Sequence, residues 1–287
     1  MRLITSIYTK EQLNHLKDYL DYALLESKEA SLNYKDLDLM DAIGFCKNNS
    51  IGIVLSMDKI YQPKTINTAK EFLEKYKDLC NYFYVTDLGV CNLAIKLGIA
   101  NKIIFDPKTM ITNSLDFSIY ASYGFHALGI SSEIMLKDTL AIIHKCNKNS
   151  FYQVFGARLM FYSKRHLISL YSEKNNEKYP KEDVLFKEAT RNDYFPGFEN
   201  QNGTVMYRSY LISLLKELGN MQDITYGFLE SYTVNDDTMK KVLSIYKNAL
   251  DGMDIKILEA EFNFLGLNIE DGFTYKDSVY QKEELKL

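Results

Sequence analysis

Residues 2–26 read RLITSIYTKEQLNHLKDYLDYALLE, and this stretch holds the unit from which most of the chain is built. A short apolar, β-branched run over 2–8 is followed by leucines at helical spacing over 13–20, with Thr9 as an N-cap. A second apolar run follows over 22–26. The order strand, helix, strand predicts parallel strands joined by a crossover helix.

The same unit recurs along the chain. Further strand candidates lie at 51–55, 82–86, 102–105, 126–130, 151–155 and 223–229. Helical patterns lie between or after them at 37–47, 66–78, 91–98, 116–123, 135–145 and 236–249. The strands are continuous apolar runs, which is typical of a parallel sheet buried on both faces. No glycine-rich fingerprint follows the first strand, so a closed TIM-like (β/α)8 barrel is favoured over a doubly wound sheet.

The rhythm is interrupted between the seventh and eighth strands. Residues 172–183 are polar and charged and predict a solvated loop. Two apolar runs then flank Gln201, Asn202 and Gly203, and an Asn-Gly turn between such runs predicts a β-hairpin excursion. Residues 209–218 resume a helical pattern.

The last part of the chain is expected to add to the barrel. Residues 257–282 have mixed strand character, and the tail after them is expected to fray. We therefore predict a barrel over 1–250 that includes a hairpin insertion over 172–208, and a C-terminal extension over 251–287.

Composition sets further bounds. Lys plus Arg is 34 against 38 for Asp plus Glu, a net charge of -4, which excludes a generally basic protein that coats nucleic acid. The 4 cysteines have no CxxC spacing and fit reduced thiols. No apolar run reaches the length of a membrane span and the N-terminus lacks the features of a signal peptide, so we expect a soluble, cytoplasmic protein with no membrane partner.

The densest group of chemically capable side chains follows the seventh strand. After Gly156 and Ala157 come Arg158, Tyr162, Ser163, Lys164, Arg165 and His166. Because active groups of a TIM barrel lie at the carboxyl ends of its strands, this cluster is expected to mark the mouth of the barrel.

The segment 156–169, GARLMFYSKRHLIS, resembles the signature of peptidase family U32, the collagenase-like peptidases of unknown catalytic type. That signature reads His-Gly-Ala-Leu-Cys, two residues, Tyr-Ser-Gly-x-Cys-Leu-x-Ser. The matching positions are Gly156, Ala157, Tyr162, Ser163, Leu167 and Ser169. Further similar positions are Asp87 to Val90, Thr112-Asn113, Ser132-Glu133, Arg191, Tyr194 to Pro196, Gly203-Thr204, Glu230 and Tyr246. The resemblance implies a TIM-like barrel, in agreement with the strand pattern.

The chain departs from the family at positions that matter chemically. Members with an iron-sulfur cluster ligate it through cysteines, two of them in the matched segment, and here those positions are Leu159 and His166. No cysteine follows Cys146. We therefore predict that no iron-sulfur cluster is bound.

The predicted strand ends supply the candidate site residues. They carry Glu26, Asp58, Asp87, Asp106, Glu133, Arg158 and Glu230, with His166 and Arg191 on the excursion. Converging carboxylates could hold a divalent cation or form an acid/base pair, although Asp87 and Asp106 could equally cap helices. We predict catalytic roles for Glu133, Glu230 and His166. Substrate-binding roles are predicted for Arg158, Tyr162, Ser163, Arg191 and Asp87.

Three functions remain open. The family resemblance implies a peptidase, a hydrolase that would bind a peptide or a small anionic ligand at the mouth. Other members take part in hydroxylation of RNA or quinone precursors, usually with a cluster, which this chain is not equipped to hold. The alternative is a non-catalytic binding or partner subunit, in which the basic run around Lys164 contacts an anionic ligand, a nucleic acid or another protein.

Overall fold

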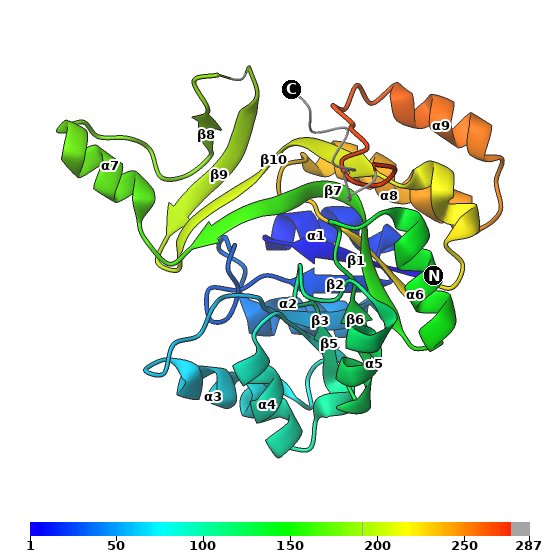
Figure 1. The fold of residues 1–287 in the computed structure, drawn as a ribbon, viewed down its shortest axis with the longest axis horizontal. Helices are drawn as coiled ribbons and strands as arrows, with labels where there is room; N and C mark the ends of the chain where they lie inside the picture. Colours follow the sequence, from blue (N-terminus) through cyan, green and yellow to red (C-terminus); the bar gives the residue numbers. More distant parts are fainter. Residues whose placement is uncertain (191, 277–287) are drawn as a thin grey trace, which may run out of the picture.

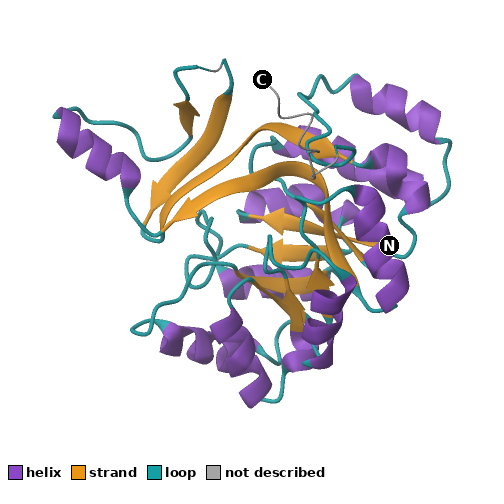
Figure 2. Ribbon diagram, viewed as in Figure 1, coloured by secondary structure: helices purple, strands orange, loops and turns teal. Residues whose placement is uncertain are grey.

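A closed ring of eight parallel strands forms the centre of the computed structural model, which describes residues 1–190 and 192–276 (Figures 1 and 2). The ring strands are β1 (Arg2–Ile7), β2 (Tyr22–Leu25), β3 (Gly52–Met57), β4 (Tyr82–Val85), β5 (Ile103–Phe105), β6 (Ala127–Gly129), β7 (Ser150–Ser163) and β11 (Tyr226–Leu229). Strand β11 pairs in parallel with both β1 and β7, and this closes the ring.

Helices follow the strands and cover the outside of the ring. They are α1 (Lys10–Leu16), α2 (Leu39–Asn48), α3 (Ile66–Tyr76), α4 (Leu88–Lys96), α5 (Ser114–Ser122), α6 (Leu136–Cys146) and α8 (Asp236–Leu250). Short 3-10 turns are η1 (Lys17–Tyr19), η2 (Ala100–Lys102) and η3 (Leu215–Asn220). The sequence prediction of a TIM-like (β/α)8 barrel is confirmed. In the described part of the chain, no helix is long and apolar enough to cross a membrane.

Apolar side chains alternate between two cores along each strand. Leu24 points into the ring, where Ile4, Val54, Tyr84 and Phe228 pack with it, whereas its neighbours on β2 pack against the helices. Both faces of each strand are therefore buried, which explains why the strands read as continuous apolar runs. Each fully buried side chain of this kind contributes about 1.5–3 kcal/mol relative to an exposed one.

Strand β7 leaves the ring and carries the chain outward. It pairs in parallel with β11 up to Phe155 and then antiparallel with β10 (Gly203–Ser213). Gly156 marks the change: its φ is +104°, and a Cβ there would lie 2.3 Å from the carbonyl oxygen of Glu230. No residue other than glycine fits this position without strain.

The outer part of β7 begins a segment that we call the excursion, residues 156–213. It also contains α7 (Leu167–Asn175), β8 (Val184–Lys187), β9 (Tyr194–Asn200) and β10 (Figure 1). The sheet order continues from β7 through β10 and β9 to β8. The predicted hairpin is confirmed, since β9 and β10 pair antiparallel around Asn202 and Gly203.

Two sequence predictions are wrong in this region and after it, and a third is confirmed in part. The helix expected at 209–218 begins instead as the end of β10, because pairing with β7 overrides the helical pattern. The loop expected at 172–183 is confirmed over 176–183, whereas its first residues form the last turn of α7. The C-terminal segment starts with a helix, α9 (Ile255–Asn263), whose Leu258 and Phe262 are buried, and residues 277–287 lie outside the described residues.

Candidate functional site at the barrel mouth

Polar residues occupy the first position after several ring strands. Tyr8 follows β1, Glu26 follows β2, Asp58 follows β3, Asp106 follows β5 and Glu230 follows β11. The carboxyl ends of parallel strands meet at one end of a barrel, so these side chains gather there. We call them, with Lys108, the barrel mouth.

Glu230 is buried and held by several donors. Its Oε1 accepts hydrogen bonds from Ser6 Oγ at 2.7 Å, from Tyr8 OH at 2.8 Å and from the Tyr232 N–H at 3.0 Å. Burial raises the pKa of Glu230, although these donors and Lys108 act in the opposite direction. This carboxyl is thus fixed in position and easier to protonate than an exposed one.

Glu26 is buried with one oxygen unsatisfied. Its residue is 4% exposed, and Oε2 has no hydrogen-bond partner. Burial raises the pKa of Glu26 well above its ordinary value, and the charges of Asp58 and Glu230 raise it further. Glu26 therefore holds its proton to a higher pH than an exposed glutamate does.

Asp58 lies beside Glu26 but is better solvated and better bonded. It is half-buried, and its Oδ1 accepts the Leu32 N–H at 2.7 Å and Ser56 Oγ at 3.2 Å. Burial raises the pKa of Asp58 as well, while these donors and Lys108 oppose the change. Asp58 consequently ionises more readily than Glu26, so these two neighbouring carboxyls differ in how readily they give up a proton.

Lys108 supplies a positive charge to the mouth. It forms an ion pair with Asp106 at 3.1 Å and also donates to Tyr84 OH, and its side chain is 41% exposed. Burial acts to lower the pKa of Lys108, but the carboxylates of Asp106, Asp58 and Glu230 outweigh it and raise the pKa. The ammonium group therefore stays charged near the acid/base pair.

Tyrosines form much of the wall around the carboxylates. Tyr207 and Tyr232 have ring centroids 5.0 Å apart, and Tyr232 also meets Tyr8 edge to face. Burial raises the pKa of Tyr162 to about 12, and burial also raises the pKa of Tyr8 and Tyr207. These hydroxyls remain protonated at neutral pH and can donate hydrogen bonds.

The tip of the excursion is attached to the mouth. Asn200 Nδ2 donates to Leu32 O and Asn202 Nδ2 donates to Ser31 O, both at 2.9 Å. Ser31 and Leu32 lie in the loop after β2, and the Leu32 N–H of this loop donates to Asp58 Oδ1. The β9–β10 hairpin thereby helps to position Asp58 from a distant part of the chain.

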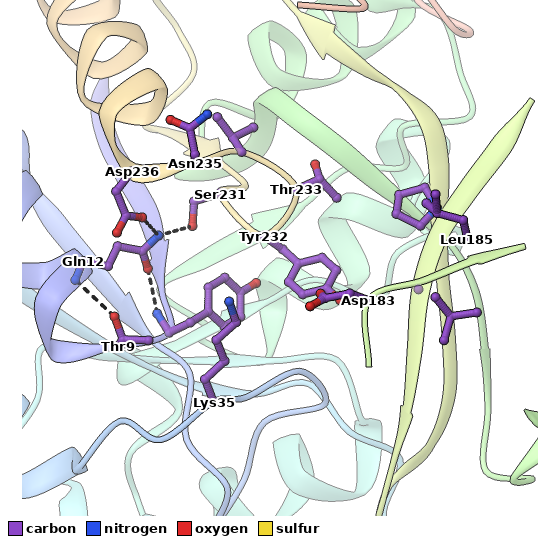
Figure 3. A pocket seen from close by; sticks show the side chains of 15 residues that line it. Thr9, Gln12, Lys35, Asp183, Leu185, Ser231, Tyr232, Thr233, Asn235 and Asp236 are labelled. Atoms are coloured by element: carbon purple, nitrogen blue, oxygen red, sulfur yellow. Dashed lines mark hydrogen bonds between the residues drawn. The ribbon is translucent and has the colours of Figure 1, made fainter. Parts of the chain in front are cut away.

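Two cavities adjoin the mouth. The larger, about 540 Å³, lies between the loop after β11, the start of α1 and strand β8 (Figure 3). In it Gln12 Nε2 donates to Ser231 Oγ at 3.2 Å and to Asp236 at 3.0 Å. The smaller, about 190 Å³, is lined by Arg158, Lys108 and Glu133 among others.

The structure gathers some of the residues predicted from sequence. Glu230 lies in the mouth, and Arg158 and Glu133 line the smaller cavity, where Arg158 is buried and Glu133 exposed. Tyr162 bridges the barrel and the hairpin, since its hydroxyl accepts the Ile60 N–H and donates to Asn202 O.

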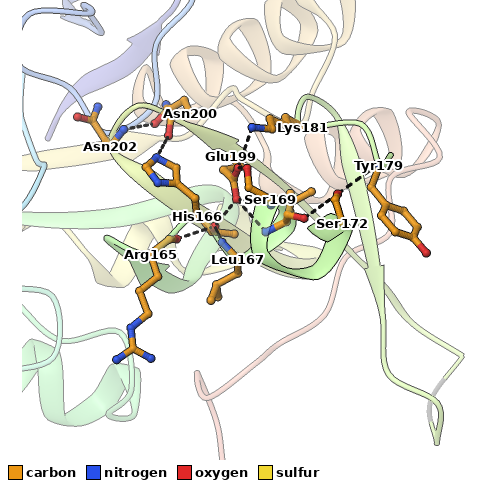
Figure 4. A network of polar contacts seen from close by, with 12 residues as sticks. Arg165, His166, Leu167, Ser169, Ser172, Tyr179, Lys181, Glu199, Asn200 and Asn202 are labelled. Carbon is orange, nitrogen blue, oxygen red and sulfur yellow. Dashed lines mark hydrogen bonds and ion pairs between the residues drawn. The ribbon is translucent and has the colours of Figure 1, made fainter. Parts of the chain in front are cut away.

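Other predicted residues lie elsewhere. Ser163 is at the outer end of β7, and His166 is exposed with its Nε2 3.1 Å from Asn200 O (Figure 4). Among the described residues, His166 makes no hydrogen bond to a mouth carboxylate, and its catalytic role remains a prediction. Asp87 caps α4, accepting the Gly89 and Val90 N–H groups, and Arg191 lies outside the described residues.

The mouth also contains residues that the sequence patterns did not single out. Lys108 and Tyr8 were absent from the candidates, although Tyr8 directly follows β1 and Lys108 comes two residues after Asp106. Their positions just after the ends of predicted strands are the sequence feature that identifies Tyr8 and Lys108. Tyr207 comes from β10, and only long-range pairing brings it to the mouth.

The available donors do not fit a cysteine-ligated iron-sulfur cluster. Leu159 lines the smaller cavity, and Cys46, Cys80 and Cys91 are buried between the helices and the ring. Burial raises the pKa of Cys46 to about 12, which disfavours the thiolate that a metal requires. Over residues 1–190 and 192–276, no three or more His, Cys, Asp or Glu side chains are grouped so as to hold a metal ion.

The fold and the mouth define a (β/α)8-barrel protein with an acidic, tyrosine-walled site at the carboxyl ends of its strands. The family model of peptidase family U32 matches residues 13–266. The chain therefore belongs to this family.

A solved structure agrees with the barrel. The U32 peptidase Mk0906 is 10% identical over 80% of this chain and 92% of its own, with a TM-score of 0.50, and supports the fold alone. The 3-dehydroquinate dehydratase from Aquifex aeolicus VF5 is 15% identical over 53% of this chain and 78% of its own, with a TM-score of 0.39, and adds nothing to the assignment. Among curated proteins, the comparison found no match.

Proposed function

We propose that this chain is a peptidase that hydrolyses the peptide bond by general acid/base catalysis with Asp58 and Glu26. Membership of peptidase family U32 supports the reaction class. The observation that carries the proposal is the pair of mouth carboxyls with different environments, one bonded and half-buried, the other buried with a free oxygen. Such a pair keeps an acid and a base available at the same pH.

In this scheme Asp58 acts as the base. Its carboxylate takes a proton from a water molecule while the water oxygen adds to the carbonyl carbon of the peptide bond. Protonated Glu26 then gives its proton to the amide nitrogen as the carbon-nitrogen bond breaks. The proton held by Asp58 returns to Glu26 through solvent, and the site is restored.

Lys108 and the tyrosines have supporting roles in the proposal. The Lys108 ammonium favours the ionised form of Asp58 and the negative charge that develops on the carbonyl oxygen. Tyr8 and Ser6 keep Glu230 in place, and the negative form of Glu230 would hold Glu26 in its protonated state.

The test compares two aspartates that have similar backbone bonds at opposite ends of the barrel. Asp58 Oδ1 accepts the Leu32 N–H at 2.7 Å and Asp21 Oδ2 accepts the Leu3 N–H at 2.8 Å. Asp58→Asn should lower kcat on casein or gelatin peptides by about 10²–10⁴-fold. Asp21→Asn keeps a backbone acceptor and should leave kcat within about twofold of wild type.

New peptide N-termini would be counted by mass spectrometry after incubation with each variant. Full activity in Asp58→Asn would show that the base is assigned wrongly. A wild-type protein that cleaves none of these peptides would contradict the peptidase proposal itself.

The alternative, a non-catalytic partner subunit, is favoured by one feature of the excursion. Large apolar side chains are exposed there on α7, β8 and β9, namely Leu170, Tyr171, Leu185 and Tyr194. Exposed apolar groups on a protruding segment suit contact with another protein. Replacing Leu170 and Leu185 by Ser should release a co-purifying partner if this function holds, and should change nothing in peptide cleavage.

A further inference from the structure

Arg158 is a buried cation that forms no ion pair with any residue in the described ranges 1–190 and 192–276. It follows Gly156 and Ala157 on β7 and is 7% exposed. Its Nη1 donates to the carbonyl oxygen of Ser132 at 3.0 Å, while Nε and Nη2 are buried without a hydrogen-bond partner. Buried guanidinium groups are normally paired, because an unpaired buried charge destabilises the folded state. An arrangement of this kind indicates a group that is missing from the protein alone.

The unpaired atoms have a definite geometry. Nε and Nη2 form one edge of the planar guanidinium, and their N–H bonds are parallel. The two oxygens of a carboxylate fit that edge in a bidentate pair. Because Nη1 already donates to Ser132 O, the edge formed by Nε and Nη2 is the one on which neither nitrogen has an acceptor in the described part of the chain.

The surroundings of Arg158 decide the size and charge of the ligand. The cavity that Arg158 lines has a volume of about 190 Å³, roughly that of six water molecules in the liquid. Lys108 lines it but is paired with Asp106, and the exposed Glu133 lines it as well. With Lys108 paired to Asp106, the cavity has the unpartnered donors of Arg158 beside the carboxylate of Glu133, and repulsion from this carboxylate disfavours a doubly charged phosphate more than a singly charged anion.

The apolar part of the cavity suits an organic anion. Phe151 and Phe228 stack with ring centroids 5.3 Å apart, and both line the same space. Lys108 lines this cavity, and its charge also acts on Asp58, the base of the proposed pair.

From these features we infer that the cavity at Arg158 binds the C-terminal carboxylate of a peptide, so that the mouth removes residues from the C-terminal end. This inference rests on the proposed peptidase function for its catalytic part, whereas the carboxylate site stands on Arg158 alone. Nε and Nη2 of Arg158 are both shielded from water, so binding requires a local opening of the cavity wall. The bound carboxylate then accepts one charge-assisted hydrogen bond from each of these two nitrogens.

The experiment measures binding by calorimetry for three short N-acetylated peptides on the full chain. One has a free C-terminal carboxylate, one is its C-terminal amide, and one is an amide whose last residue is Glu. The Glu26→Gln background prevents turnover. We expect the free acid to bind at least about tenfold more tightly than both amides. Tighter binding of the Glu amide would assign the cavity to an acidic side chain, and tighter binding of inorganic phosphate than of the free acid would also overturn the proposal.

Arg158→Gln provides the matched variant, with the exposed Arg165→Gln as its control. Arg158→Gln should weaken binding of the free-acid peptide by about 10- to 100-fold and leave binding of the two amides unchanged. Arg165→Gln should change the binding of none of the three peptides. The Tm of ligand-free Arg158→Gln should stay equal to wild type or rise, because an unpaired buried charge is removed. If Arg158→Gln lowers the Tm and weakens the binding of all three peptides equally, Arg158 has only a structural role.

The two proposals fail in different ways. If the active chain cleaves amidated peptides internally and as fast as free acids, the peptidase proposal stands and the C-terminal preference is wrong. If free acids bind selectively but no peptide is cleaved by wild type, the carboxylate site stands and the peptidase proposal is wrong.

Discussion

Glu199 on the excursion and Glu26 in the barrel mouth are equally buried, each 4% exposed, yet they have opposite surroundings. Glu199 accepts hydrogen bonds from the Ile168 N–H at 2.8 Å and the Ser169 N–H at 3.1 Å, and lies 3.2 Å from Lys181 Nζ (Figure 4). Burial acts to raise the pKa of Glu199, but these contacts outweigh it and lower the pKa. In Glu26 one oxygen has no partner and burial raises the pKa.

The difference separates a structural carboxylate from one available for chemistry. Glu199 reaches from β9 to the first N–H groups of α7, where a negative charge is favourable, and so fixes the excursion. Glu26 has no comparable set of contacts: Ser56 and Ser31 are the hydrogen-bond donors that act on its carboxyl, and Oε2 has no partner among the described residues. A buried polar group that is left unsatisfied in an otherwise well-bonded fold is a candidate for function.

Replacing Glu26 by its amide should give the largest effect, and this effect should be on activity. Glu26→Gln cannot donate the proton to the leaving amine and should lower kcat by about 10²–10⁴-fold with little change in unfolding free energy. Peptide cleavage and urea unfolding would be measured on the same preparation. Equal activity in wild type and Glu26→Gln would remove Glu26 from the mechanism.

Glu199→Ala should instead lower stability. Removing the carboxylate leaves the α7 N–H groups and Lys181 without their acceptor, at a cost of about 3 kcal/mol. Hydrogen exchange should show the loss in α7 and β9 first, because the ring of parallel strands does not use Glu199. Unchanged protection of α7 would mean that its contacts with Glu199 are not what holds it.

The hairpin anchor should show a smaller effect. Asn202→Ala removes the bond to Ser31 O and should cost about 1–2 kcal/mol, and it should also lower activity if the loop at Leu32 positions Asp58. Asn175→Ala, whose side chain bonds Tyr171 O on an exposed surface, is the matched control and should cost less. Equal losses in the two variants would argue against a positioning role for the hairpin.

The dependence of stability on pH should give the smallest but most direct contrast, at most about 1.4 kcal/mol per pH unit for each group. The folded pKa of Glu26 is raised, so its contribution is present below the unfolded pKa of about 4.3 and is lost as pH rises through the folded pKa. The folded pKa of Glu199 is lowered, so its contribution is present above about 4.3 and is lost as pH falls through the folded pKa.

Wild type should therefore lose stability relative to Glu26→Gln as pH rises above about 4.3, and relative to Glu199→Gln as pH falls below it. Urea midpoints from pH 3 to 8 would test this. If the difference in urea midpoint from wild type changes with pH in the same direction for both variants, the pKa values of the two carboxyls are not shifted in opposite directions.

Local patterns in the sequence were sufficient for the ring and for part of the mouth. Continuous apolar runs at regular spacing identified the eight strands, and the Asn-Gly turn identified the β9–β10 hairpin. Because strand ends determine where a barrel places polar groups, Glu26, Asp58 and Glu230 were among the candidates before any coordinates. The matched family motifs pointed toward Glu133 instead of Glu26 as a catalytic residue, a role that remains a prediction.

Only the tertiary structure decided which of these residues work together. Strand β7 continues past Gly156 and pairs with β10, and this takes Ser163 and His166 outward, turns Ser209 to Ser213 into strand, and brings Tyr207 to the mouth. The unsatisfied oxygen of Glu26 and the free edge of Arg158 are likewise invisible in sequence. Strand continuation, burial and the pairing of a charge depend on groups far apart in the chain, whereas periodicity depends on neighbours, and this is why the sequence could predict the barrel but not its chemistry.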